Sequence, residues 1–280
     1  MKSASVAFIG GGQWGMALLD ALISNPHVRL TAILTDKTDI FAQSRAFSEA
    51  VKAMSYSTHE SYQSLISEGA DAIVMAGWSR KIPSSFISSV KCPFVNIHGS
   101  LLPQYRGPEP IIQQLLHDAD MGGVTIHSVG HDWDSGAICV QREFTIDPQD
   151  NNRTLFLKAV RTGMKALSEF VEKLLDSSLD FQPQDENKAT YYRRLNIMDF
   201  IIDESYSVAD VVRISRAFVG QYPLVYRQGS QLIQLLEFRL TKETQNELPM
   251  HSLRDAFLII TKSTPCSAVG RNTGFSGALT

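Results

Sequence analysis

The 280-residue chain has few of the features that mark secreted, membrane or nucleic-acid-binding proteins. Its three cysteines, Cys92, Cys139 and Cys266, lie far apart, which excludes a disulfide framework and a cysteine-rich zinc site. No apolar run approaches the ~18 residues that a membrane-spanning helix needs. The 26 basic side chains do not outnumber the 29 acidic ones, so a broad basic face for nucleic acid is not expected.

The amino-terminal segment MKSASVAFIGGGQWG does not resemble a secretory signal, because its apolar stretch is short and leads into a glycine-rich turn. The composition, 44% hydrophobic and 20% charged, is that of a globular protein with a sizeable core. We therefore expect a cytoplasmic protein without a membrane partner.

Apolar runs alternate with helix-length segments in the first half of the chain. Strands are predicted over residues 5–9, 29–34, 71–77 and 94–98. Strands separated in this way pair in parallel. The runs at 124–129 and 137–146 have no helix between them and are expected to pair antiparallel, before an amphipathic helix over 153–176. This pattern predicts an α/β fold with a mostly parallel sheet.

The composition shifts beyond about residue 190. A helix is predicted over 208–218, followed by strands in the segments LVYRQ, QLIQLLEFRL and AFLIITK. These elements predict a small C-terminal α+β or β-rich subdomain. We place the larger domain at 1–185 and the subdomain at 186–280.

Three glycines, Gly10, Gly12 and Gly15, follow the first strand and open a helix. This context fits a dinucleotide-binding fingerprint, and Asp36 ends the second strand where a ribose-binding acid would lie. The glycines could equally serve a tight strand-to-helix turn. An NAD(P)-linked reductase and a purely structural turn both stay open on these residues.

The strand at 94–98 ends in Asn96 and His98, which alternation places on one face. A proline-rich loop, GSLLPQYRGPEPI, follows directly, and prolines pre-order a binding loop. Farther along, HDWDSGAI carries Asp132 and Asp134 in a sequence that also suits a simple turn. The histidines and aspartates between 127 and 134 match no metal-ligand spacing, so we predict no metal site.

The run NIHGSLLPQYRGPEPI, followed by WDSG, resembles the signature of the folate-dependent formyltransferases. Members of this family transfer a formyl group from 10-formyltetrahydrofolate to an amine. The resemblance covers roughly residues 5–240. It implies a Rossmann-like N-terminal catalytic domain that does not bind NAD, with the glycine loop and Gly12 shaping the substrate cleft instead.

The resemblance also assigns the site. It makes Asn96, His98 and Asp134 the catalytic residues. An amide and an imidazole can donate hydrogen bonds to the oxyanion that forms on the formyl group, and a carboxylate can orient the imidazole or relay the proton of the amine. The residues expected to bind folate are Trp78, Arg80, Ile82, Pro83, Phe86, Asp132 and Trp133. Of these, Trp78, Ile82 and Phe86 could equally belong to the core.

The acceptor is less well defined. The linker YYRR and the motif SLLPQYRG are similar to those of nucleotide-sugar N-formyltransferases, so we expect an amino sugar carried on a nucleotide. The residues expected to bind it are Gly12, Tyr105, Arg106, Gly107, Arg193 and Arg194. Methionyl-tRNA, glycinamide ribonucleotide and hydroxyornithine remain alternative acceptors, and a formyl-folate hydrolase or an inactive relative stays open. The acidic balance and the short C-terminal segment disfavour tRNA. The strands at 231–238 and 256–261 could form a homodimer interface or a local core.

Overall fold

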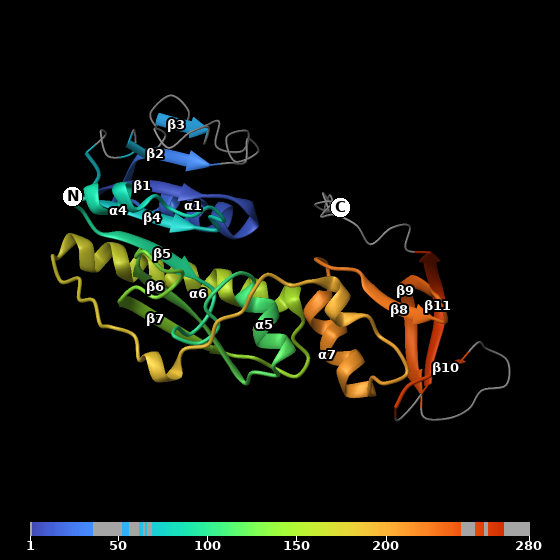
Figure 1. Cartoon of the computed structure of the whole chain (residues 1–280). Helices are drawn as coiled ribbons and strands as arrows, with labels where there is room; N and C mark the ends of the chain where they lie inside the picture. Colours follow the sequence, from blue (N-terminus) through green and yellow to red (C-terminus); the bar gives the residue numbers. More distant parts are fainter. Residues whose placement is uncertain are drawn as a thin grey trace. The chain divides into compact units, whose positions relative to one another are not determined.

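Two β-sheets organise the chain in the computed structural model, which describes residues 2–35, 52–55, 62, 63, 65, 69–241, 250–254 and 257–265 (Figure 1). The larger sheet has seven strands and the smaller has four. The chain forms two compact units, each assembled from several segments. The first unit comprises 1–111, 120–146 and 156–193, and the second comprises 112–119, 147–155 and 194–280. The expected division near residue 185 stays a prediction.

The larger sheet has the strand order β3-β2-β1-β4-β5-β6-β7. Its strands are β1 (Ala4–Gly10), β2 (Val28–Thr35), β3 (Lys52–Ser55), β4 (Ala72–Ala76), β5 (Phe94–His98), β6 (Met121–Ser128) and β7 (Ile138–Thr145). The first five pair in parallel, whereas β6 runs antiparallel to both β5 and β7. The predicted α/β class, the mostly parallel sheet and the antiparallel pair are confirmed.

Helices cover both faces of this sheet. They are α1 (Gly12–Ser24), α4 (Ser84–Ser89) and α6 (Asn152–Leu175), and a further helix, α5 (Pro110–Leu116), follows the loop after β5. Alternation along each strand divides the core into two layers. In β1, Val6 and Phe8 join the apolar faces of α1 and α6, while Ala7 and Ile9 join the layer that contains α4. None of the helices in the described ranges is long and apolar enough to cross a bilayer.

The glycine loop packs against the end of β4. A Cβ at Gly10 or Gly15 would crowd the carbonyl oxygen of Ala76, and one at Gly77 would overlap the carbonyl oxygen of Gly11. Close approach of two backbones therefore accounts for these glycines. Gly12 is different: it is exposed, has φ +63 and has open space around it. Its expected role in shaping the substrate cleft stays a prediction. Asp36 lies outside the described residues.

The second unit holds the smaller sheet, of order β10-β11-β9-β8. Its elements are α7 (Val208–Phe218), β8 (Leu224–Gln228), β9 (Gln231–Thr241), β10 (Met250–Ser252) and β11 (Phe257–Pro265). A capping box fixes the start of α7, because Ser207 and Asp210 each accept the other's backbone N–H. The predicted α+β character of this region is confirmed, and α7 has the predicted bounds.

Candidate active site

The end of β5 presents Asn96 and His98 on the face of the sheet that α4 covers. Phe94 packs in that layer, and the next alternate residues of the strand follow it. Because β6 runs antiparallel to β5, its register places His127 directly beside Asn96. The two side chains meet, with the Asn96 amide nitrogen 3.1 Å from His127 Nε2. One amide and two imidazoles are therefore held by rigid strands.

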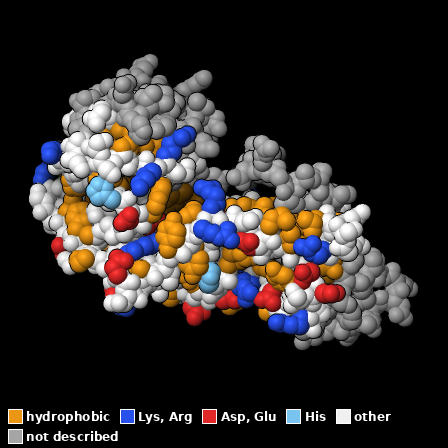
Figure 2. Space-filling model, in the orientation of Figure 1, with side chains coloured by type: hydrophobic (Ala, Val, Ile, Leu, Met, Phe, Trp, Pro, Cys, Tyr) orange, Lys and Arg blue, Asp and Glu red, His pale blue; other side chains and the backbone are white. Residues whose placement is uncertain are grey.

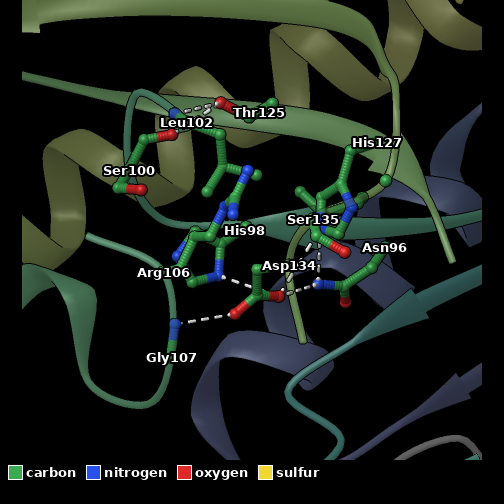
Figure 3. Close-up of polar contacts among 12 residues, drawn as sticks. Asn96, His98, Ser100, Leu102, Arg106, Gly107, Thr125, His127, Asp134 and Ser135 are labelled. Carbon is green, nitrogen blue, oxygen red and sulfur yellow. Dashed lines mark hydrogen bonds and ion pairs between the residues drawn. The ribbon is translucent and has the colours of Figure 1, made fainter. Parts of the chain in front are cut away.

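Asp134 comes from the loop between β6 and β7 and points at these side chains (Figure 3). Its Oδ1 accepts a hydrogen bond from the Asn96 amide at 3.3 Å and lies 3.6 Å from both His98 Nδ1 and His127 Nε2. Its Oδ2 accepts the backbone N–H of Gly107 at 2.9 Å. The structure thus brings together the three predicted catalytic residues.

The turn that presents Asp134 is unusually tight. Asp134 itself has φ 52, a left-handed conformation that aspartate tolerates better than most residues. Two residues later, a Cβ at Gly136 would overlap the carbonyl oxygen of Ser128. The Asp-Ser-Gly sequence therefore serves both the turn and the placement of a carboxylate.

Hydrogen bonds fix the orientation of both imidazoles. His98 Nε2 lies 2.8 Å from the carbonyl oxygen of Tyr105, and His127 Nδ1 lies 3.0 Å from that of Ser128. A carbonyl only accepts, so each of these nitrogens carries a proton. The remaining nitrogen of each ring is the one that faces Asp134. In a neutral ring, His127 Nε2 accepts the Asn96 N–H.

The Asp134 carboxyl is mostly buried but stays ionised. Burial alone would raise its pKa, yet the charges of the neighbouring His98 and His127 imidazoles and the Gly107 N–H outweigh it and hold the pKa well below its ordinary value. A carboxylate with so low a pKa is a weak base. Its arrangement suits electrostatic stabilisation and orientation of the imidazoles better than permanent proton removal.

Polar side chains of β6 and β7 hold the loop that carries Gly107 against the sheet. The Thr125 hydroxyl of β6 donates to the carbonyl of Ser100 and accepts the N–H of Leu102. Gln141 of β7 donates to the carbonyl of Leu102 at 2.9 Å. The Leu102–Pro103 peptide bond is cis. The loop that carries Gly107 is therefore pre-ordered rather than a loose connection.

A small pocket of about 40 Å³, open to solvent, is lined in part by Asn96 and Asp134. Its wall includes four of the residues expected to bind folate: Arg80, Ile82, Asp132 and Trp133. The Trp133 side chain is 44% exposed.

The other three residues expected to bind folate lie elsewhere. The structure places Trp78 and Phe86 in the core, where the Trp78 indole donates to the Tyr62 hydroxyl and Phe86 packs on Tyr62. Pro83 is the N-cap of α4. These side chains were expected in the pocket wall because their segment resembles the stretch that lines the pterin pocket in the family. Of the three, Trp78 and Phe86 pack in the same apolar layer as Ile82.

The residues expected to bind the acceptor have different environments. Tyr105 stacks on Tyr192 with ring centroids 5.6 Å apart. Gly107 faces Asp134, as described above. Arg106 is buried, and its guanidinium is engaged by Gln184 and Glu186. Its placement indicates a structural role. Arg193 ends a segment of the first unit and Arg194 begins one of the second, and both are exposed.

Three residues near the site were not predicted from the sequence to belong to it. His127 could have been found only from the antiparallel register with β5. Gln184 contacts the loop of Asp134 from fifty positions away. Tyr191 is 59% exposed beside Gly107, and only the aromatic linker hinted at it. The structure shows no cluster of three or more metal-ligating side chains among the residues it describes.

The sequence of this chain is similar to known proteins of one family. A family model for formyl transferases matches residues 4–171. Two relatives are methionyl-tRNA formyltransferases. The one from Lactobacillus acidophilus is 30% identical over 67% of this chain and 63% of its own length. The one from Legionella pneumophila is 25% identical over 89% of this chain and 83% of its own length.

Among solved structures, an N-formyltransferase from Helicobacter canadensis, in complex with folinic acid and dTDP-3-aminofucose, covers 94% of this chain and 100% of its own. Its TM-score is 0.68 at 21% identity, so this likeness concerns the fold. The chain spans about 63% of the Lactobacillus relative. The family model covers more than half of the chain and includes Asn96, His98 and Asp134, and the chain therefore belongs to the formyl transferase family.

Proposed function

We propose that this protein transfers the formyl group of 10-formyltetrahydrofolate to the amino group of a nucleotide-linked amino sugar. The observation that best supports formyl transfer is the placement of the Asp134 carboxylate. It is held in its ionised form between Asn96, His98 and a backbone N–H at the edge of the pocket. This arrangement offers hydrogen-bond donors and a negative charge where an amine would meet a formyl carbon.

The pocket suits a folate donor. A reduced pterin is a flat heterocycle that needs apolar walls and polar groups at its rim. Ile82 and Val129 supply apolar surface, and the backbone from Gly130 to Asp132 supplies polar groups. Trp133 lies at the wall, where its exposed ring is available to pack against the donor. We assign this pocket to the pterin end of the donor.

The residues account for the chemistry of the transfer. Asn96 would release its 3.3 Å hydrogen bond to Asp134 and donate instead to the carbonyl oxygen as the amine nitrogen bonds to the formyl carbon and negative charge develops on that oxygen. His98, held by Tyr105 and Asp134, would accept the proton that the amine loses and become an imidazolium. It would then pass this proton to the folate nitrogen that leaves. The amine loses one proton, and the folate nitrogen that leaves gains one. Asp134 stabilises the imidazolium throughout, and no cysteine is required.

An amino sugar on a nucleotide is the acceptor that the surroundings favour. Tyr191, exposed beside Gly107, offers an aromatic face to a base or sugar, and Arg193 is one residue from the Tyr105–Tyr192 stack. Acidic and basic side chains are interspersed on the face shown in Figure 2, whereas a tRNA-binding surface needs a basic field. The Helicobacter protein bound to dTDP-3-aminofucose adds support. The methionyl-tRNA formyltransferase relatives make Met-tRNA the second candidate.

A formyl-transfer assay tests this proposal. Purified protein is incubated with 10-formyltetrahydrofolate and, separately, with amino-sugar nucleotides, glycinamide ribonucleotide, hydroxyornithine and methionyl-tRNA, and the products are weighed by mass spectrometry. We expect an amino-sugar nucleotide heavier by one formyl group. A product from methionyl-tRNA alone would refute the acceptor and keep the transfer. Folate released without any acceptor would indicate a hydrolase.

A further inference from the structure

The segment of residues 181–192, called the brace below, touches both loops that form the catalytic site. At one end, Gln182 exchanges two backbone hydrogen bonds with Ile138, at 2.7 and 2.8 Å, beside the loop that carries Asp134. At the other end, Thr190 and Tyr192 bond to the loop that carries Gly107. The brace therefore spans the two sides of the Asp134–Gly107 hydrogen bond.

Gln184 lies at the middle of this bridge. Its amide nitrogen donates to the carbonyl oxygens of Asp134, at 2.8 Å, and Gly136, at 2.7 Å. Its amide oxygen accepts from Arg106 Nε at 3.1 Å and from Nη2 at 2.8 Å. One side chain thus binds the backbone of the catalytic aspartate and the residue that precedes Gly107. All four of its strong hydrogen-bonding positions are used.

Arg106 completes the link from the other side. Its guanidinium is buried, so it needs these partners, and it also forms a two-bond pair with Glu186 at 2.9 and 2.7 Å. Its backbone N–H and carbonyl bond to Thr190 and Tyr192. The chain on both sides of the Arg106 side chain is therefore fixed to the brace, and Gly107 follows it directly.

We infer that Gln184 is a positioning residue, which sets the distance between the Asp134 carboxylate and the Gly107 N–H by holding both loops to one side chain. Asp134 occupies a left-handed backbone conformation at a tight turn, so its carbonyl must be held for its carboxylate to stay in place. A misplacement of about 1 Å can cost about 100-fold in rate. The inference rests on the proposed transfer only for its kinetic consequences.

Three variants test it. Gln184→Met removes all of these hydrogen bonds while keeping the side-chain length. Gln184→Glu keeps the acceptor for Arg106 but puts an oxygen against the two carbonyls. Gln182→Met is the matched control, because the Gln182 side chain is exposed and donates only to Asp180 among the hydrogen bonds described. Should the first variant not fold, the second carries the test.

Two measurements are made on each variant. Amide hydrogen exchange of the full-length protein without substrates reports Gly107 directly, and we expect its protection to fall at least ~10-fold in both Gln184 variants while β4 and β5 amides are unchanged. In the transfer assay, kcat should fall about 30- to 100-fold with both KM values changed less than about threefold. The Gln182 control should match the wild type in both.

The outcomes separate the two proposals. Wild-type exchange at Gly107 in the Gln184 variants would overturn the inference, whatever the enzyme transfers. A uniform loss of protection across the sheet would also overturn it, because it would indicate a general structural role. If the wild-type protein transfers no formyl group, the proposed function fails and the exchange result still decides the role of Gln184.

Discussion

Replacing Asp134 with asparagine should nearly abolish formyl transfer while leaving the fold intact. The substitution keeps the shape of the side chain but removes a charge that lies 3.6 Å from His98 Nδ1. Two unit charges at that distance attract by roughly 5 kcal/mol at an effective dielectric constant of about 20. If that attraction forms fully as the imidazole takes a proton in the transition state, its loss corresponds to a kcat decrease of about 3 × 10³-fold.

The assay is single-turnover formyl transfer followed by mass spectrometry, with thermal unfolding of each variant measured in parallel. The control is Asp20→Asn, which removes an exposed carboxylate of α1 and should leave both kcat and Tm at wild-type values. An Asp134→Asn protein that folds and keeps more than a tenth of the wild-type kcat would refute the electrostatic role assigned to this carboxylate.

Three further predictions concern stability and the donor pocket. Because the folded pKa of Asp134 lies below its unfolded value, its carboxylate stabilises the fold above about pH 4 and loses that contribution as pH falls, so the Tm difference between wild type and Asp134→Asn should shrink on acidification, as calorimetry can measure. Gly136→Ala should lower Tm markedly, because its methyl group would overlap the Ser128 carbonyl, and a wild-type melting curve would contradict this packing. Trp133→Ala should weaken folate binding about tenfold in a fluorescence titration with Tm nearly unchanged, and unaltered affinity would remove Trp133 from the donor site.

The sheet was predictable because its signal is local. Buried parallel strands appear as short apolar runs between helix-length segments, and β1, β2, β4 and β5 each lie within two residues of the prediction. The same period of two placed Asn96 and His98 on one face without any knowledge of the partner strands. The resemblance at WDSG then supplied Asp134, which no local pattern distinguishes from an ordinary turn aspartate.

Contacts between distant segments were not predictable. His127 joins the site only through the register of β6 against β5, which depends on the turn geometry between them. Arg106 was assigned to the acceptor because it lies in the motif SLLPQYRG, and its buried contacts with Gln184 and Glu186 could not be read from that motif. Trp78 and Phe86 illustrate the converse, since an aromatic residue near a pocket motif can equally be core.

The way in which Asp134 is held links its carboxylate to the loop that carries Gly107. Its Oδ2 is bound by a backbone N–H of that loop, and His98 is oriented by the Tyr105 carbonyl two residues earlier. Substitutions that reshape this loop would therefore also move the groups that fix the carboxylate and the imidazole.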